Sequence, residues 1–158
     1  MVDEFIEGLC IDDVFFNIKG KSKKSIISSM LDHLCHIKKI DKKYKKSILK
    51  AVIQREEMGS TAIGGHIALP HARLNCIKKI VICVATSKEG VDFDALDDEP
   101  VYVIVLLLSN QQEAGLHLKT LAHLAKLLRD RSFVQKLKDA NDREEIINLI
   151  IRQYNLLK

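Results

Sequence analysis

Several features that mark specialised classes of protein are absent from this sequence. It contains no tryptophan, and its longest apolar run covers only residues 101–108. A helix that crosses a bilayer needs about 20 apolar residues, so this run is far too short. The N-terminal residues show neither a basic flank nor an apolar signal segment. We therefore expect a cytoplasmic protein with no direct membrane insertion.

The four cysteines are spaced too widely to form a C-x-x-C pair; they are Cys10, Cys35, Cys76 and Cys83. This spacing argues against a structural zinc site. It favours free thiols, mostly buried, in a reducing compartment. We expect no metal and no cofactor.

The common nucleotide and hydrolase motifs are also missing. The sequence contains no G-x-x-x-x-G-K-[ST], no G-x-G-x-x-G, no G-x-S-x-G and no H-E-x-x-H. Nucleotide hydrolysis, dinucleotide redox chemistry and zinc proteolysis therefore have no support from a motif.

The net charge of +4 comes largely from lysines gathered between residues 38 and 50. Such a cluster can bind nucleic acid or another anionic partner, or it can be the solvated face of a helix. Only one aromatic residue, Tyr44, and no arginine lies among these lysines to stack on bases. We therefore favour a solvated face and expect no nucleic-acid partner.

Hydrophobic periodicity predicts alternating helices and strands in one domain over residues 1–158. Helices are expected at 3–10, 22–38, 41–58, 116–129, 132–139 and 141–154, and strands at 14–18, 67–71, 79–86 and 101–108. Ser22, Asp41, Ser132 and Asn141 are the expected N-caps. The alternation predicts the α/β class, with a mixed β-sheet flanked by helices on both faces in three α/β/α layers.

The chain is organised around residues 55–73. Three of the seven glycines fall at positions 59–65, where the backbone can take positive φ or approach a ligand closely. The run 67–69 then leads to Pro70, which fixes its own φ and keeps the chain extended before it. His71 thus stands at the end of a predicted strand, behind a loop rich in N–H groups and hydroxyls.

Phosphoryl transfer to an imidazole suits this segment. Such chemistry needs an unprotonated ring nitrogen, donors for the phosphate oxygens and a nearby positive charge. Ser60, Thr61 and the N–H of Gly64 are candidate phosphate donors, and Arg55 can supply charge. His117 begins a predicted helix, whose N-terminus favours anions. The alternative is structural: His71 as a satisfied strand-end residue and His117 as a helix-start residue.

Residues 59–72, GSTAIGGHIALPHA, closely resemble the active-site signature of the type 2 IIA domains. These domains belong to the fructose, mannitol and nitrogen-related branch of the bacterial sugar phosphotransferase system. The resemblance continues in Arg55-Glu56, in 91–97 with Pro100-Val101, in 106–108 and in 117–122. It covers nearly the whole chain.

The resemblance implies that His71 is phosphorylated by the histidine-containing phosphocarrier protein. It implies that His117 assists at the phosphate and that Arg55 orients or neutralises charge. The phosphate would pass to a IIB component, which feeds sugar uptake. Alternatively, phosphorylation of His71 would control a regulatory target protein without sugar transport, as in the nitrogen-related branch. One departure is His66, where members usually carry a small residue; it could be a donor beside the phosphate or an exposed loop residue.

Overall fold

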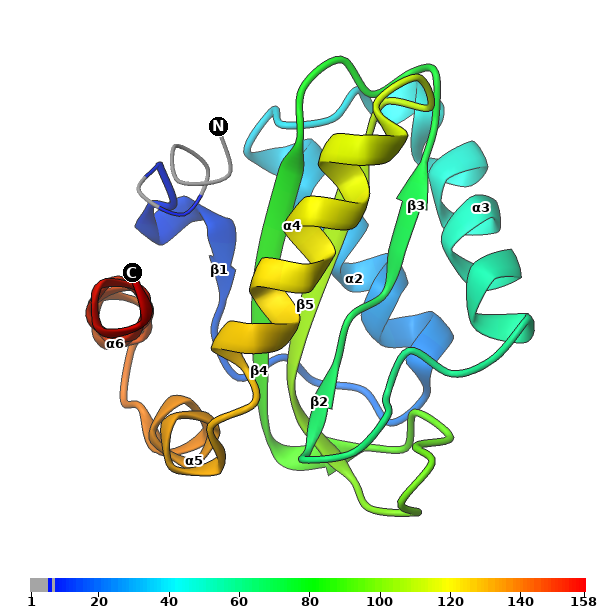
Figure 1. The fold of residues 1–158 in the computed structure, drawn as a ribbon. Helices are drawn as coiled ribbons and strands as arrows, with labels where there is room; N and C mark the ends of the chain where they lie inside the picture. The colour runs from blue at the N-terminus through cyan, green and yellow to red at the C-terminus, as the bar shows by residue number, and fades with distance from the viewer. Residues whose placement is uncertain (1–5, 7) are drawn as a thin grey trace.

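A mixed β-sheet forms the centre of the computed structural model, which describes residue 6 and residues 8–158 (Figure 1). Its strand order is β1-β4-β5-β2, and β3 also pairs with β5. The strands are β1 (Val14–Phe15), β2 (Ile67–Ala68), β3 (His71–Arg73), β4 (Val81–Val91) and β5 (Val101–Ser109). β4 runs antiparallel to β5, whereas β2 and β3 run parallel to it along its other side. β5 is thus central, as its apolar run predicts.

β2 and β3 follow one line along β5. Ile67 pairs with Val103 and His71 pairs with Leu107, so the register does not shift between the two strands. Pro70 lies between them and has no N–H to donate, although its carbonyl accepts a hydrogen bond from the N–H of Leu107. The single strand predicted at 67–71 is therefore two short strands, and His71 opens the second at the edge of the sheet.

Helices cover both faces of the sheet and create two apolar cores. They are α2 (Lys23–His36), α3 (Lys45–Glu57), α4 (Ala114–Leu127), α5 (Arg131–Asp139) and α6 (Arg143–Leu157). In Figure 1, α4 crosses in front of β5 and α2 lies behind the sheet. Along β5, residues 104, 106 and 108 belong to the core with α2 and α3, and residues 103, 105 and 107 to the core with α4, α5 and α6. This alternation confirms the predicted three layers.

Two predicted helix starts are confirmed. The side chain of Ser22 accepts a hydrogen bond from the N–H of Ser25 at the start of α2. Asp41 caps a short 3₁₀ turn, η2 (Lys42–Tyr44), that leads directly into α3. Both caps satisfy N–H groups that have no partner within their own helix.

Two other predicted caps are wrong. α5 is capped by Asp130 instead of Ser132, and α6 by Asp142 instead of Asn141. In each case an aspartate carboxylate accepts the backbone N–H three residues later, and a charged acceptor binds more strongly than a hydroxyl or an amide. The side chain of Glu145 in turn accepts the N–H of Asn141.

Near the N-terminus, the 3₁₀ turn η1 (Ile11–Asp13) leads into β1. Of the helix predicted at 3–10, residues 3–5 and 7 lie outside the described residues, and residues 8–10 are not helical. Among the helices of the described part, none is long and apolar enough to cross a bilayer.

The cysteines are free thiols, as predicted, but they are less buried than expected. Only Cys83 is fully buried, and Cys10 is exposed. Burial raises the pKa of the Cys83 thiol to about 12, so this cysteine stays protonated in the core.

Candidate active site

His71 is held at the sheet edge by a hydrogen bond to the backbone between β2 and β3. Its Nδ1 lies 2.8 Å from the carbonyl oxygen of Leu69. A carbonyl oxygen can only accept, so Nδ1 carries the proton and donates it. In the neutral ring, Nε2 is then left with a lone pair. The backbone around Pro70 thus selects the tautomer of His71.

The surroundings of His71 favour its neutral form. Burial lowers the pKa of its imidazole below the ordinary value, and the Arg55 guanidinium lowers it further. The bond to the Leu69 carbonyl and the carboxylate of Glu56 oppose this shift. The net direction is downward, so the ring is unprotonated at neutral pH. A neutral imidazole with a free lone pair can act as a nucleophile.

His117 lies beside His71 although 46 positions separate them in the sequence. It stands in the first turn of α4, where its side chain is buried. The two ring centroids are 5.3 Å apart, and the ring planes make an angle of 57°. Burial, together with His71 and Arg73, lowers the pKa of His117 to about 4. The structure thus brings two neutral histidines together, as the sequence predicts for this pair.

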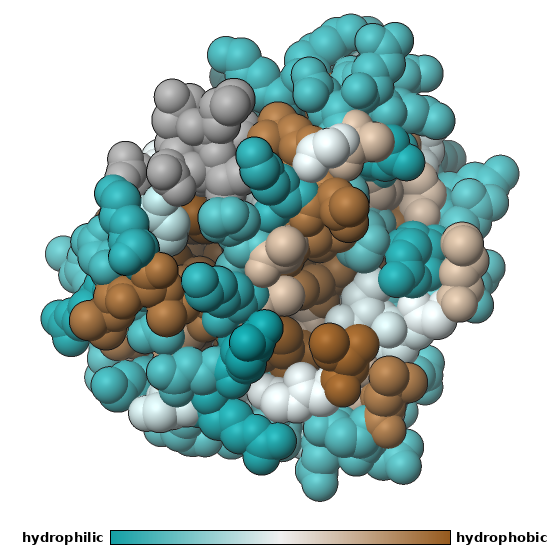
Figure 2. All heavy atoms as spheres, viewed as in Figure 1, coloured by the Kyte–Doolittle hydropathy of each residue, from teal (hydrophilic) through white to brown (hydrophobic). Residues whose placement is uncertain are grey.

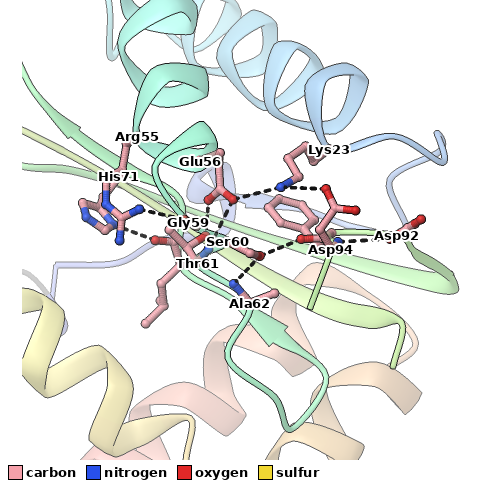
Figure 3. A network of polar contacts seen from close by, with 12 residues as sticks. Lys23, Arg55, Glu56, Gly59, Ser60, Thr61, Ala62, His71, Asp92 and Asp94 are labelled. Carbon is pink, nitrogen blue, oxygen red and sulfur yellow. Dashed lines mark hydrogen bonds and ion pairs between the residues drawn. The ribbon is translucent and has the colours of Figure 1, made fainter. Parts of the chain in front are cut away.

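Arg55 comes from the last turn of α3 and joins the same site. Its Nη1 donates to the carbonyl oxygen of Gly59 at 2.8 Å, which ties the helix end to the loop (Figure 3). The remaining N–H groups of the guanidinium have no hydrogen-bond partner among the described residues, and its charge acts on the His71 ring. A fixed cation beside a neutral imidazole suits an anionic group on that imidazole.

The two hydroxyl residues of the loop have partners within the protein (Figure 3). Ser60 Oγ donates to the carbonyl oxygen of Phe93 at 2.6 Å and accepts from the N–H of Ala62. Thr61 Oγ1 donates to the carboxylate of Glu56. Each hydroxyl has one proton and has already donated it. The phosphate-donor role expected of Ser60 and Thr61 stays a prediction, and it would require these bonds to break.

Gly64 lies against the acidic connection between β4 and β5. Its φ is +131°, and a Cβ atom there would meet Asp97 Oδ2 at 3.2 Å. The same carboxylate oxygen accepts the N–H of Gly65. The structure thus gives Gly64 a conformational reason to be glycine. Its expected contact with phosphate stays a prediction.

His66 has a role that neither sequence interpretation describes. Its backbone is left-handed, with φ of +67°, and its Nδ1 donates to the carbonyl oxygen of Pro100 at 2.8 Å. Its ring packs 5.3 Å from that of Tyr102. Five residue-to-residue steps of extended chain separate it from His71, roughly 16 Å at the usual rise of a strand. His66 is therefore half-buried and fastens the loop to the start of β5, away from the two-histidine site.

Three site residues were missed by the sequence reasoning. Arg73 follows His71 by two positions on the same face of β3, and its positive charge lowers the pKa of His117. Ser109 pairs with Arg73 in register and bonds His117 Nδ1 through its hydroxyl. Glu56 is the buried acceptor of hydrogen bonds from the N–H and the hydroxyl of Thr61. Two sequence signals could have identified the first two: the two-residue period of a strand puts Arg73 on the same face as His71, and Ser109 is the polar residue that ends the apolar run.

Together these residues create surroundings that suit an anion beside a ring nitrogen with a free lone pair. Two guanidinium groups, a buried second histidine and a lone pair on His71 meet at one edge of the sheet. Residues 9–153 match the family described as phosphoenolpyruvate-dependent sugar phosphotransferase system, EIIA 2. The chain belongs to this EIIA family.

Relatives of both branches of this EIIA family resemble the chain. A nitrogen regulatory protein of Bradyrhizobium diazoefficiens is 34% identical over 106 residues, covering 67% of this chain and 69% of that protein. A fructose-specific EIIA component of Haloferax volcanii is 28% identical over 129 residues, covering 82% of each. The crystal structure of nitrogen regulatory protein IIA-Ntr from Neisseria meningitidis matches with a TM-score of 0.82 and 26% identity, covering 92% of this chain and 98% of that one. EIIA proteins are phosphotransfer proteins, and the family includes sugar-specific and nitrogen regulatory members.

Proposed function

We propose that this EIIA chain carries a phosphoryl group on Nε2 of His71, as one IIA domain over residues 1–158. It accepts the group from the histidine-containing phosphocarrier protein and passes it to a IIB component. One observation carries the proposal: Nδ1 of His71 donates to the Leu69 carbonyl at 2.8 Å, which leaves the lone pair on Nε2. Membership of a phosphotransfer family supports the same chemistry.

The transfer needs no cofactor and no net proton movement. The lone pair on His71 Nε2 attacks the phosphorus of the donor's phosphohistidine, and a new N–P bond forms. The donor's N–P bond breaks, and its electron pair returns to the donor nitrogen. Nδ1 keeps its proton throughout, because the Leu69 carbonyl continues to accept it. The reverse sequence of bond changes delivers the group to the next carrier.

The charged neighbours have roles in this scheme. The phosphoryl group brings about two negative charges to the edge of the sheet. Arg55 supplies positive charge to His71, Arg73 supplies positive charge to His117, and His117 supplies a ring N–H. Preorganised donors of this kind stabilise charge that develops during transfer.

Exposed apolar side chains near the site support docking of a protein donor. Met58 is 83% exposed just after α3, Ile63 is 66% exposed in the loop, and Leu118 is 70% exposed beside His117. Figure 2, viewed as in Figure 1, shows apolar patches between polar ones on the side of α4. Apolar groups among polar ones are typical of surfaces that bind other proteins. A phosphate donor that is itself a protein fits this surface.

A second candidate is a regulatory protein, in which the phosphorylation state of His71 controls a target protein without sugar transport. One observation favours it: a nitrogen regulatory relative is 34% identical over 106 residues, whereas fructose-specific relatives reach 30% over 134 residues. Both candidates use the same chemistry at His71. They differ in the recipient, so transfer from the phosphorylated chain to a purified IIB protein distinguishes them.

Labelling with phosphoenolpyruvate tests the shared chemistry. The chain is incubated with enzyme I and the phosphocarrier protein, and we expect acid-labile, base-stable phosphate. His71→Ala should abolish the label. His123→Ala is the matched control, because His123 is an exposed histidine of α4. Full labelling of the His71→Ala variant would overturn the proposal.

A further inference from the structure

Ser109 is a buried polar residue in contact with the second histidine of the site. It ends β5, has 0% exposure, and its hydroxyl forms a hydrogen bond with Nδ1 of His117. Its backbone is also held in place, because its carbonyl oxygen accepts a hydrogen bond from the N–H of Leu74 at 2.9 Å. The serine is therefore held rigidly by the sheet while it touches a side chain of α4.

The direction of this hydrogen bond can be decided by accounting for the protons. Ser109 Oγ has one proton, and within the described residues its only hydrogen-bond partner is His117 Nδ1. If Nδ1 donated, the serine proton would be buried without an acceptor, which costs about 1–3 kcal/mol. If the serine donates, its proton is satisfied and Nδ1 accepts with its lone pair. The second arrangement leaves no buried group unsatisfied.

The tautomer of His117 follows from this direction. A neutral imidazole carries one proton, so a ring that accepts at Nδ1 must carry its proton on Nε2. His117 is neutral at pH 7, because burial lowers its pKa to about 4. Its Nε2–H has no hydrogen-bond partner among the described residues, so it is available to a ligand.

We propose that Ser109 is a positioning residue that fixes His117 as the Nε2–H tautomer, so that the two histidines present opposite groups to the phosphate. His71 presents a lone pair, which forms the N–P bond. His117 presents an N–H, which donates to a phosphoryl oxygen. This inference rests on the proposed function for its purpose, although the tautomer itself is a property of the unphosphorylated protein.

The architecture explains why a serine is needed at this position. Leu69 supplies a carbonyl oxygen to His71, and that oxygen can only accept. Ser109 supplies a hydroxyl to His117, and that hydroxyl can donate. Two different backing groups thus give two chemically identical side chains opposite tautomers, 5.3 Å apart between ring centroids.

Long-range ¹H–¹⁵N correlation spectra of the full chain, labelled at histidine and unphosphorylated at pH 7, test the tautomers. We expect His117 to be protonated on Nε2 and His71 on Nδ1. A His117 ring protonated on Nδ1 would overturn the proposal, whatever the transfer activity. Because no phosphate donor is present, this result is independent of whether His71 is ever phosphorylated.

Variants of Ser109 test its effect on transfer. We expect Ser109→Ala to slow phosphorylation of His71 by about tenfold to a hundredfold, because a misoriented group near a reacting centre costs rates of this order. Ser109→Thr keeps the hydroxyl and should restore both the rate and the tautomer. Ser87→Ala is the matched control, since Ser87 is equally buried but its hydroxyl serves Gly90 at the other end of β4. A Ser109→Ala variant with the control's rate and an unchanged His117 spectrum would contradict the inference.

Discussion

Replacing Glu56 by alanine should destabilise the protein strongly, because this carboxylate holds the loop that precedes His71. Glu56 is buried and accepts hydrogen bonds from the Thr61 hydroxyl and from the Thr61 N–H at 3.2 Å. It also forms an ion pair with Lys23 at 3.3 Å, and Lys23 reaches Asp94 at 3.2 Å (Figure 3). One side chain thus joins α2, α3 and the glycine-rich loop.

The magnitude follows from the groups left behind. In Glu56→Ala, the N–H and the hydroxyl of Thr61 lose their acceptor in a site that is only 7% exposed. Each unsatisfied buried donor costs about 1–3 kcal/mol, and removing one partner of a buried ion pair costs about 3–5 kcal/mol. Lys23 keeps its ion pair with Asp94, so the two costs do not add in full. We expect the free energy of unfolding to fall by about 3–5 kcal/mol in total. That is a large part of the roughly 5–15 kcal/mol that stabilises a typical domain.

Glu56→Gln is the matched variant, because it keeps the shape and removes only the charge. Its amide oxygen can accept the Thr61 N–H, and its NH₂ can donate to the Thr61 hydroxyl, which turns to accept. The lost charge weakens the contact with Lys23, so we expect about 1–2 kcal/mol.

Urea unfolding at 25 °C measures both variants. We expect the urea midpoint to be highest for the wild type, lower for Glu56→Gln and lowest for Glu56→Ala. The m-values should be equal, since the surface exposed on unfolding does not change. A cost below about 1 kcal/mol for alanine, or equal costs for the two variants, would refute the reasoning about buried donors.

Three further predictions concern the site. Because burial lowers the pKa of His117 from 6.5 to about 4, the unfolded chain binds this proton first as the pH falls. The free energy of unfolding therefore falls as the pH drops below the unfolded-state pKa, by about 2 kcal/mol between pH 7 and pH 5. Urea unfolding at both pH values should show that His117→Gln lacks this loss. Gly64→Ala should cost about 1–3 kcal/mol in the same assay, because φ is +131° there, yet leave labelling of His71 intact, because alanine keeps the N–H expected to reach the phosphate; lost labelling in a folded variant would show that transfer depends on the conformation of this loop. Arg55→Lys should slow labelling by about tenfold, because one ammonium cannot both bind Gly59 and face a phosphate; an unchanged rate would remove Arg55 from the site.

The sequence predicts the parts of the fold that depend on local pattern. The apolar run at 101–108 identifies the central strand. The Pro70-His71 step indicates an extended segment but places His71 at a strand end, whereas the structure has it at the start of β3. Ser22 is a correct cap because its partner lies three residues away. The pairing of His71 with His117 comes from resemblance, since nothing local connects a strand end with a helix start 46 positions later.

The parts that sequence reasoning missed depend on distant partners. Ser60 looks like a free phosphate donor until the fold brings the Phe93 carbonyl to its hydroxyl. Ser109 looks like an ordinary strand end in the sequence. In the fold it pairs with Arg73 and its hydroxyl contacts His117 of α4. His66 resembles an exposed loop residue until Pro100 and Tyr102 meet its ring. No local pattern records these contacts, because each joins segments that only the folded sheet brings together.

The central claim is that His71 accepts the phosphoryl group on Nε2, and one spectrum tests it most directly. The chain, labelled with ¹⁵N at histidine, is phosphorylated through enzyme I and the phosphocarrier protein, and ¹H–¹⁵N correlations with ³¹P coupling are recorded. We expect a ³¹P coupling on Nε2 of His71 while its Nδ1 keeps the proton donated to Leu69. A coupling on Nδ1, or on another histidine, would contradict the account.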